Sequence, residues 1–477
     1  MPFSLPYARA SHREGVEMPR ARWWVIGALS VVTFGVIVLD TTGVIFDDSS
    51  GSEDLVVPPP LVLPVLPDAE LALPPAVEPL PAPPDRPRVR QVERALDAEA
   101  LGPSVHALVA PLAEPSSPWL EIDADELATP ASTIKLWTAT AALDGYSPQG
   151  RLETAAVWDA KASRLVLVGG GDATLTTEPV KGQSTASLAT LTRSTVRALR
   201  QDGVSTVRLA YDSTLFSGPA EARSWEPTYV SSGVIAPVTA LMVDQGRAST
   251  DGTALLSDPA VGAAEQFAEQ LSAAGITVRG KLAKAKAPDV QPLATVSSPP
   301  MADLVERMLR DSDNQLAEAL GRMAAVAQGE PGSFAGVSTA LKQAGAKRDV
   351  NLGNAEINDA SGLARDDTIP ASSLVAALHA ASIEPELAPI LSGLSVAGFN
   401  GTLAERFSAG PAAEGAGVVR AKTGTLTGIS AEAGVVTTCD GDLVAFAFVA
   451  DEVADTDAAR KALDDAAAAL ATCPKRL

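Results

Sequence analysis

The chain has 477 residues, of which 46% are hydrophobic and 20% charged, so most of it can bury a core. Its formal net charge of −21 argues against a nucleic-acid partner, which would need basic patches to meet phosphate. With three His and two Cys in all, we expect no metal site, iron–sulfur cluster or other cofactor, and a Ser-His-Asp hydrolase is disfavoured too.

A hydrophobic segment near the N-terminus predicts a membrane anchor. Residues 23–39 are uncharged, and as a helix at ~1.5 Å per residue they would span roughly 25 Å, the short end of what a bilayer needs. Four Arg precede this segment and none follows until Arg86, so the positive-inside rule places the rest of the chain outside the cytoplasm. Because residues 40–60 contain no Ala for a cleavage site, we expect a cytoplasmic tail over 1–22 and an uncleaved signal anchor over 23–46. A cleaved signal peptide and a buried core helix are the alternatives.

A proline-rich segment follows the predicted anchor. Residues 58–87 contain 12 prolines, which leave few backbone donors and favour extended polyproline II at ~3.1 Å per residue. We therefore predict a disordered linker over 47–92 that holds a folded body away from the membrane. A proline-rich docking ligand is the alternative, which an extracytoplasmic location disfavours.

The body of the chain, from about residue 93, mixes strand and helix patterns. Short runs of β-branched and apolar residues predict strands, and apolar residues at helical spacing predict helices. The predicted strands cover 104–112, 164–170, 276–282, 417–424, 429–438 and 442–451, and the predicted helices cover 132–143, 261–274, 301–328 with a polar break at 311–314, and 458–472. Strands flanked by helices, with adjacent strands near the C-terminus, predict an α+β fold with a mostly antiparallel sheet.

The first chemical motif is Ser132-Thr133-Ile134-Lys135 at the start of a predicted helix. Residues i and i+3 share a helix face, so the hydroxyl of Ser132 and the amine of Lys135 can meet there. The N–H groups at a helix N-terminus also point at an oxyanion that forms beside the serine. A lysine that accepts a proton must be neutral, which requires a pKa lowered by about 3 units, and burial beside a second lysine would do this. An incidental pair on a helix is the alternative.

Two further motifs follow in the chain. Ser312-Asp313-Asn314 lies in the polar break, where a loop could aim a hydroxyl and an amide into a cleft; a turn or an N-cap is the alternative. Lys422-Thr423-Gly424-Thr425 lies in a predicted strand, where Gly424 permits close backbone approach. Its two Thr hydroxyls, at i and i+2, face one side of the strand and suit a carboxylate ligand; a solvated strand edge is the alternative. The three motifs in this order are jointly far more specific than any one of them.

With these motifs the chain resembles the serine penicillin-recognising enzymes, and within them the low-molecular-mass class C D-alanyl-D-alanine carboxypeptidases/endopeptidases. The resemblance runs from about residue 93 to the C-terminus. It is supported by characteristic stretches at 167–175, 232–247, 358–367, 394–407 and 421–436.

The resemblance implies a role for each motif residue. Ser132 would be the nucleophile and Lys135 the general base. Ser312 and Asn314 would relay protons and hold the substrate amide, while Lys422 would anchor charge. Thr423, Gly424 and Thr425 would bind the substrate, and the backbone N–H groups of Ser132 and Thr425 would form the oxyanion hole.

The resemblance also implies a domain layout. It predicts a β-lactamase/transpeptidase-like catalytic domain over 93–155 and 292–477, in which helices flank an antiparallel sheet. A smaller inserted domain is expected over 156–291. Because the interval from Ser132 to Ser312 is shorter than is usual for the family, we expect the family's third nested domain to be missing.

The implied function is that of an extracytoplasmic serine peptidase anchored in the bacterial cell membrane by one span. It would act on peptidoglycan stem peptides and take β-lactam antibiotics as covalent inhibitors. A β-lactamase or esterase with the same motifs, and a non-catalytic scaffold that binds the cell wall, are the alternatives. Because the compartment is oxidising and the Cys count is even, Cys439 and Cys473 are expected to form a disulfide.

Overall fold

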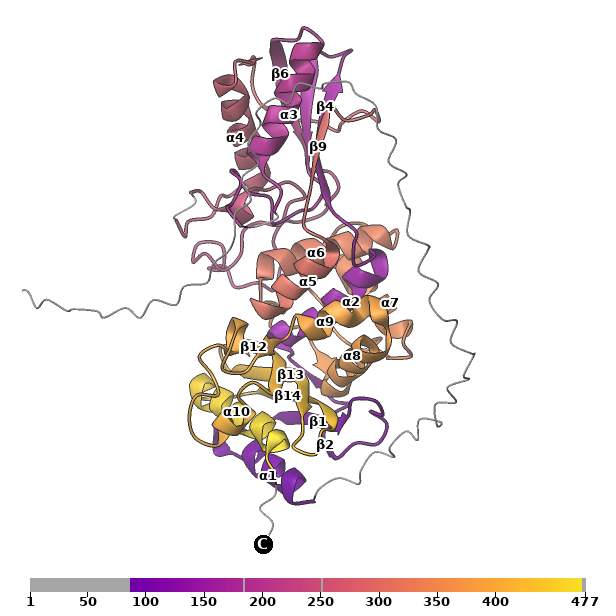
Figure 1. Ribbon diagram of the computed structural model, residues 1–477, viewed down its shortest axis with the longest axis vertical. Helices are drawn as coiled ribbons and strands as arrows, with labels where there is room; N and C mark the ends of the chain where they lie inside the picture. The colour runs from indigo at the N-terminus through magenta and orange to yellow at the C-terminus, as the bar shows by residue number, and fades with distance from the viewer. Residues whose placement is uncertain (1–85, 183–184, 250–251, 474–477) are drawn as a thin grey trace, which may run out of the picture. The chain divides into compact units, whose positions relative to one another are not determined.

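The computed structural model describes residues 86–182, 185–249 and 252–473 (Figure 1). The predicted signal anchor over 23–46 lies outside these residues. The predicted linker reaches too far, because helix α1 (Arg86–Leu96) already begins within it. The apolar spacing of Val92 and Leu96 outweighs the proline content there: both side chains are buried in the core that α1 shares with helix α10 (Thr456–Ala471).

The first sheet has six strands in the order β11-β12-β13-β14-β1-β2, and each neighbouring pair is antiparallel. Its long central strands come from the C-terminal part of the chain, where the sequence predicted adjacent strands. The strand β1 joins them from the other end of the described chain, with Val105 opposite Ala450 of β14. The bounds are β1 (Val105–Pro111), β2 (Leu120–Ile122), β11 (Ser395–Val396), β12 (Val419–Leu426), β13 (Ile429–Thr437) and β14 (Leu443–Asp451).

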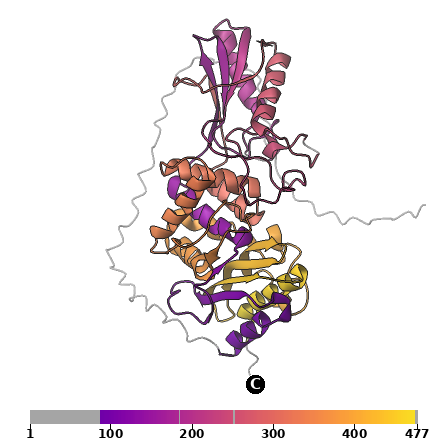
Figure 2. The same ribbon diagram turned by 180° about the vertical axis from the view of Figure 1, so that it is seen from behind.

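The two faces of this sheet belong to two hydrophobic cores. Along β14, Ala447 and Val449 contribute to one core while Phe446 and Phe448 contribute to the other, because successive side chains in a strand point to opposite faces. Helix α8 (Ala371–Ile383) packs on the first face, whereas α10 covers the second and α1 packs against α10 (Figures 1 and 2). Burying each large apolar side chain in these layers contributes about 1.5–3 kcal/mol.

Helix α2 (Lys135–Gly145) lies at the centre of the helical layer, where every residue from Lys135 to Leu143 is buried. Around it pack α5 (Met301–Arg310), α6 (Asn314–Ala327), α7 (Phe334–Ala346), α8 and α9 (Ala388–Ser392), with the short β3 (Leu127–Ala128) paired to β10 (Ile369–Pro370). Within the part of the chain that the structure describes, no single helix is long and apolar enough to cross a membrane. The bent pair Ala371–Ile383 and Pro385–Ser392 meets the criteria of length and composition together.

A second sheet is inserted between α2 and α5. Its order is β7-β6-β5-β4-β9 with β8 beside β6, and it mixes antiparallel and parallel pairs. It extends from Glu153 to Ser297, so it begins before residue 156 and ends after residue 291. The elements are β4 (Glu153–Asp159), β5 (Arg164–Val168), α3 (Leu188–Gln201), β6 (Thr206–Asp212), α4 (Pro259–Ala273), β7 (Thr277–Val278), β8 (Ala283–Lys284) and β9 (Ala294–Ser297).

The strand predicted over 276–282 is the weakest of the sequence expectations. The structure retains two residues of it, Thr277 and Val278, as β7. Gly280 has a φ of 81°, in the left-handed region, and this ends the extended backbone. The turn at Gly280 therefore shortens the strand that the β-branched pattern predicted.

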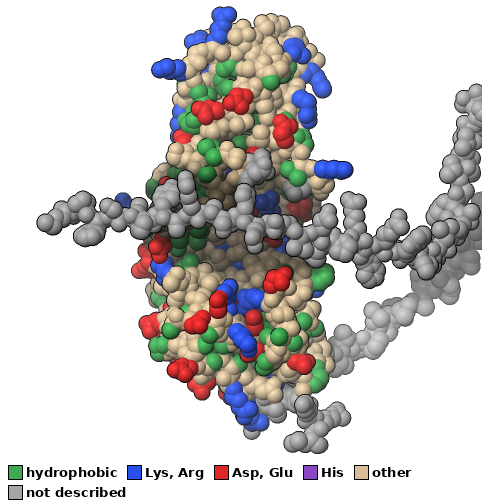
Figure 3. All heavy atoms as spheres, turned by 90° about the vertical axis from the view of Figure 1, so that its left-hand side faces the viewer, with side chains coloured by type: hydrophobic (Ala, Val, Ile, Leu, Met, Phe, Trp, Pro, Cys, Tyr) green, Lys and Arg blue, Asp and Glu red, His purple; other side chains and the backbone are tan. Residues whose placement is uncertain are grey.

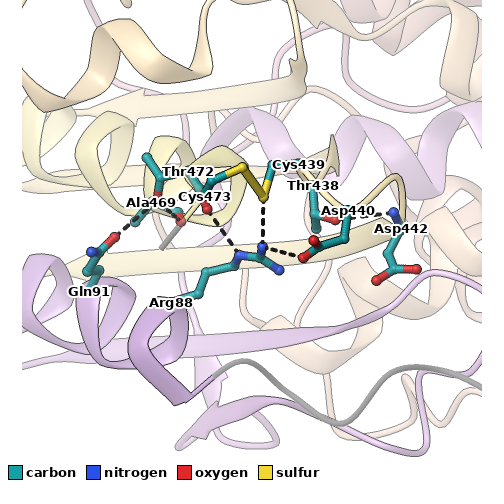
Figure 4. The surroundings of a disulfide bond; sticks show 9 residues. All are labelled: Arg88, Gln91, Thr438, Cys439, Asp440, Asp442, Ala469, Thr472 and Cys473. Carbon is teal, nitrogen blue, oxygen red and sulfur yellow. Dashed lines mark hydrogen bonds and ion pairs between the residues drawn. A yellow bond between two sulfur atoms is a disulfide. The ribbon is translucent and has the colours of Figure 1, made fainter. Parts of the chain in front are cut away.

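Cys439 and Cys473 form a disulfide, as the sequence predicted, with their Cα atoms 5.5 Å apart (Figure 4). The bond ties the turn between β13 and β14 to the end of α10. Arg88 of α1 reinforces this junction, because its guanidinium donates to the Thr472 carbonyl at 3.3 Å and to an Asp440 carboxylate oxygen at 2.9 Å. Closing a loop with a sequence separation of 34 is worth roughly 3–4 kcal/mol in the chain-entropy model.

Candidate active site

Ser132 lies in a 3₁₀ turn, Ala131–Ile134, that leads directly into α2. The sequence predicted an α-helix from residue 132, and the structure tightens its first turn. In a 3₁₀ turn residues i and i+3 eclipse one another, which stacks Lys135 on Ser132 more closely than an α-helix would. Ala131, just before the serine, has a φ of 44°, a left-handed conformation that costs a non-glycine residue of order 1–3 kcal/mol. The serine is therefore held at a strained bend.

Two glycines allow other segments to pack against this bend. On β12, a Cβ added at Gly424 would lie 2.8 Å from the Pro130 carbonyl oxygen and 3.1 Å from the Ser132 nitrogen. At Gly362, whose φ is 75°, an added Cβ would lie 1.9 Å from the Ala131 carbonyl oxygen. Since real Cβ atoms do not approach other atoms so closely, both positions require glycine. The bend is thereby fixed between the first sheet and the loop that contains Gly362.

Lys135 is fully buried behind Ser132. Its Nζ lies 2.8 Å from Ser132 Oγ, 2.9 Å from Asn314 Oδ1 and 2.5 Å from the Ser361 carbonyl oxygen. Burial lowers the pKa of Lys135 to about 8, although the negative charge of Asp359 opposes this shift. A substantial fraction of the amine is therefore neutral in mildly alkaline solution, as a proton acceptor must be.

The junction of α5 and α6 supplies the second motif. Asp313 caps α6, since its carboxylate accepts the backbone N–H of Leu316 at 3.0 Å, and this places Asn314 in the first turn with its amide oxygen at Lys135. Ser312 has a φ of 53°, in the left-handed region. The backbone conformation of Ser312 and the cap formed by Asp313 together place the Ser312 hydroxyl and the Asn314 amide near Ser132 and Lys135.

Lys422 of β12 is the second buried lysine. Its Nζ donates to Ser312 Oγ at 2.9 Å and to the Thr423 carbonyl at 2.5 Å. Burial lowers the pKa of Lys422 well below its ordinary value, and the positive charges of Lys135 and Arg406 lower it further. Lys135 thus contacts the cleft residues Ser132 and Asn314, and Lys422 contacts the cleft residue Ser312.

A cleft of about 630 Å³ opens over these groups. The neighbouring strand residues Thr423 and Thr425 line it, and the Thr423 hydroxyl donates to Thr402 Oγ1 at 2.8 Å. The cleft is rich in hydroxyl, amide and guanidinium groups. Its lining is Ser132, Glu226, Thr228, Tyr229, Val234, Ser312, Asn314, Leu363, Arg365, Thr402, Arg406, Thr423, Thr425, Leu426, Thr427 and Arg460.

Arg406 gives this cleft a fixed positive charge that the motifs did not indicate. Its guanidinium donates to Glu432 at 2.8 Å and to Asp464 at 2.6 Å. Burial raises the pKa of Glu432 to about 7, against the lowering effect of Arg406. Elsewhere the charge is mixed: on the face that Figure 3 presents, Lys and Arg side chains lie among Asp and Glu. Arg406 therefore brings a guanidinium to the cleft, and this guanidinium is paired with two carboxylates on its other side.

No feature of the sequence indicated the Ser361 carbonyl, which contacts both Ser132 and Lys135. It accepts from Lys135, and Ser132 Oγ donates to it at 3.2 Å. A backbone carbonyl carries no residue signature, so its position could be found only from the fold. Among the described residues, no group of three or more His, Cys, Asp or Glu side chains could hold a metal ion.

The structure brings the predicted site residues together from three parts of the chain. Ser132, Ser312, Asn314, Thr423 and Thr425 line the cleft, while Lys135 and Lys422 lie buried behind it. Gly424 contributes by its lack of a side chain. A serine hydroxyl next to a buried amine, in a polar cleft with a guanidinium, can carry out nucleophilic attack on a carbonyl compound that bears a carboxylate.

Comparison with known proteins gives a consistent result. The model of the "D-Ala-D-Ala carboxypeptidase 3 (S13) family" matches residues 89–254 and 252–472. A carboxypeptidase of Mycobacterium tuberculosis is 35% identical over 364 residues, which cover 74% of this chain and 77% of that protein. Penicillin binding protein 4 of Haemophilus influenzae has a similar fold, with a TM-score of 0.66 at 22% identity over 80% of this chain and 97% of that one. A structure of the same Haemophilus protein with a bound β-lactam aligns with a TM-score of 0.59, at the same identity and coverage.

Proposed function

Since the chain belongs to the D-Ala-D-Ala carboxypeptidase (S13) family, we propose that it is a serine-type D-Ala-D-Ala carboxypeptidase/endopeptidase. Its substrates would be peptidoglycan stem peptides, cleaved through an acyl-enzyme on Ser132. The observation that carries the proposal is the buried amine of Lys135, 2.8 Å from a serine hydroxyl that lines a polar cleft. β-Lactams would acylate the same serine; the Haemophilus protein of similar fold has been solved in complex with a β-lactam.

Acylation begins when the neutral amine of Lys135 takes the hydroxyl proton of Ser132. Ser132 Oγ then bonds to the carbonyl carbon of the penultimate D-Ala, and the carbonyl oxygen becomes an oxyanion. The backbone N–H groups of Ser132 and Thr425 would stabilise that charge. When the C–N bond breaks, the leaving nitrogen takes a proton from Lys135, relayed by Ser312, and an ester remains on Ser132.

Deacylation repeats these steps with water. Lys135 accepts a proton from a water molecule, and the resulting hydroxide attacks the ester carbonyl. The proton then returns to Ser132 Oγ as the ester bond breaks, which releases the shortened peptide and restores the enzyme.

Substrate binding would rest on the groups that line the cleft. The hydroxyls of Thr423 and Thr425 and the guanidinium of Arg406 would hold the terminal carboxylate of the peptide. Lys422, which is buried, would orient the Ser312 hydroxyl for the proton relay, because its Nζ donates to Ser312 Oγ at 2.9 Å. Asn314 accepts from Lys135 through Oδ1, so its NH₂ group is left to bind the substrate carbonyl.

Product analysis tests this function. The full chain, in detergent, is incubated with uncross-linked pentapeptide muropeptides and with cross-linked dimers, and the products are identified by mass spectrometry. We expect loss of the terminal D-Ala or cleavage of the cross-link, both blocked by prior treatment with a β-lactam. A pentapeptide ending in L-Ala serves as the matched control and should stay intact. Rapid β-lactam hydrolysis with intact muropeptides would identify a β-lactamase, and the absence of both reactions would favour a binding scaffold.

We also propose that residues 23–46 anchor the protein in the bacterial cell membrane with the catalytic part outside. The support is the uncharged run and the Arg-rich flank that precedes it. The full-length protein should stay with membranes after high-salt and carbonate washing and keep its intact N-terminus. A soluble species that begins after residue 40 would show instead that the segment is a cleaved signal.

A further inference from the structure

We propose that Glu318 is a positioning residue for the acylation reaction, because it holds the Ser361 carbonyl against Lys135. Glu318 lies one turn after Asn314 on the same face of α6. Its Oε1 accepts the backbone N–H groups of Ala360 at 3.0 Å and Ser361 at 2.9 Å. One helix face thus fixes two acceptors for Lys135, the Asn314 side chain directly and the Ser361 carbonyl through Glu318. The inference rests on the proposed function.

The orientation of the Lys135 amine explains why these two acceptors matter. A neutral amine has two N–H bonds and one lone pair. As an ammonium, Lys135 donates to Ser132 Oγ at 2.8 Å, to Asn314 Oδ1 at 2.9 Å and to the Ser361 carbonyl at 2.5 Å. Once Lys135 is neutral, and if Asn314 Oδ1 and the Ser361 carbonyl keep the two N–H bonds, the lone pair faces Ser132 Oγ. The Ser132 hydroxyl, which donates to the Ser361 carbonyl at 3.2 Å, must then turn its proton toward Nζ. A Ser361 carbonyl that moved away would free the amine to rotate, and the lone pair would point at the hydroxyl for less of the time.

The loop that carries Ser361 is fastened at several other points. Asp359 Oδ1 accepts the N–H of Ser361 at 2.9 Å and that of Gly362 at 2.6 Å, and the Thr138 hydroxyl donates to the Ala360 carbonyl at 2.7 Å. Asp359 and the loop belong to the same segment, whereas Glu318 links that segment to α6 and therefore to Asn314. These other bonds should keep the loop folded when Glu318 is changed.

The charge of Glu318 also affects the pKa of Lys135, and this effect is separate from the hydrogen bonds that position Ser361. Its side chain is fully buried, and Oε2 has no hydrogen-bond partner among the residues that the structure describes. Burial, with the nearby Asp359, raises the pKa of Glu318 to about 8, so the carboxyl group is mostly protonated at neutral pH. When it ionises, its negative charge raises the pKa of Lys135. The charged groups that act on Glu318 or share its surroundings are Lys135, Asp313, Arg322, Asp359 and Asp367.

Two substitutions separate these effects. Glu318→Gln keeps the Oε1 acceptor, places an amide where Oε2 has no partner, and cannot ionise. Glu318→Ala removes the acceptor. The matched control is Asp212→Ala at the end of β6, because that buried carboxylate also accepts two backbone N–H groups, from Thr214 at 2.9 Å and Ala287 at 2.7 Å, in the second sheet.

The measurement is the second-order rate of acylation of the full chain by a fluorescent penicillin, between pH 6 and about 10, with melting curves for each variant. Glu318→Ala should slow acylation roughly 10–100-fold, since a misplacement of about 1 Å can cost ~10²-fold. Glu318→Gln should restore a rate near that of the wild type and shift the pH midpoint of acylation to lower pH. Asp212→Ala should change neither the rate nor the midpoint.

The rate of acylation decides the inference. It is overturned if Glu318→Ala is folded and acylated at the wild-type rate, whereas an unchanged midpoint in Glu318→Gln would reject only the separate charge effect. If Glu318→Ala fails to fold, Glu318→Asp takes its place: withdrawing the carboxylate by one methylene should also slow acylation, and a folded Glu318→Asp variant acylated at the wild-type rate would overturn the inference. A wild-type chain that no penicillin acylates at Ser132 would instead reject the proposed function, so the two failures are distinct.

Discussion

Replacing Ser132 with alanine should abolish covalent labelling of the chain by a β-lactam. The lactam presents a strained carbonyl and a carboxylate, the two groups that the proposed mechanism assigns to Ser132 and to the hydroxyls and guanidinium that line the cleft. The full chain, treated with a penicillin and digested, should carry one added mass, on the peptide that contains Ser132. The alanine variant has no oxygen to bond the carbonyl carbon, so the loss should be complete.

The alanine variant should also stay folded. Ser132→Ala removes one oxygen at a cleft surface, and its contacts to Lys135 and the Ser361 carbonyl leave those two groups still bonded to one another at 2.5 Å. Ser231→Ala is the matched control, since that exposed hydroxyl lies beside the cleft residues Thr228 and Tyr229 and bonds to the Thr228 carbonyl. Labelling that persists in Ser132→Ala, or that disappears in Ser231→Ala, would contradict the assignment of the nucleophile.

The rate of acylation should rise with pH and level off above a midpoint near 8. Lys135 accepts a proton only as a neutral amine, and burial lowers its pKa to about 8. Below that value the neutral fraction, and with it the rate, falls about tenfold per pH unit. Stopped-flow or quenched-time-course measurements of penicillin acylation, from pH 6 upward, would give the midpoint.

Substitution of Lys135 should cost more than any other change except that of Ser132. Lys135→Ala should slow acylation by ~10²–10⁴-fold, the usual contribution of a general base. Lys135→Arg should be similarly slow, because a guanidinium keeps its proton in proteins. The control is Lys342→Ala on α7, a surface lysine whose Nζ contacts the Gly353 carbonyl at 3.4 Å. An acylation rate that is independent of pH, or an unimpaired Lys135→Arg, would reject Lys135 as the base.

Much of the first sheet could be predicted from the sequence, because the strands of this sheet alternate between two apolar cores. The segments predicted at 429–438 and 442–451 correspond to β13 and β14, where local pattern and burial agree. The boundary of α1 and the shortness of β7 could not be predicted in the same way. Packing against α10 decides the first, and the conformation of Gly280 decides the second.

The residues of the three motifs could be singled out in the sequence because their types and spacings are specific, and the structure brings them together. The groups that orient them were not. Ser361 acts through a backbone carbonyl, and Glu318 and Arg406 resemble any charged residue of a helix or loop when read in sequence. Glu318 is fully buried and Arg406 is partly buried, and the surroundings of both depend on residues far along the chain, such as Asp464, which Arg406 contacts.

The strand order of the first sheet determines when the enzyme can become active during its synthesis. Val105 of β1 pairs with Ala450, 345 positions later, and the Ser132 bend packs against Gly424, 292 positions later. A growing chain therefore contains Ser132 and Lys135 long before β12, whose residues line the cleft, has been synthesised. Such long-range pairing is slow and leaves β1 with an open edge until β14 arrives. The enzyme is accordingly latent until its last strands have emerged, and the Cys439–Cys473 bond can form only after that completion.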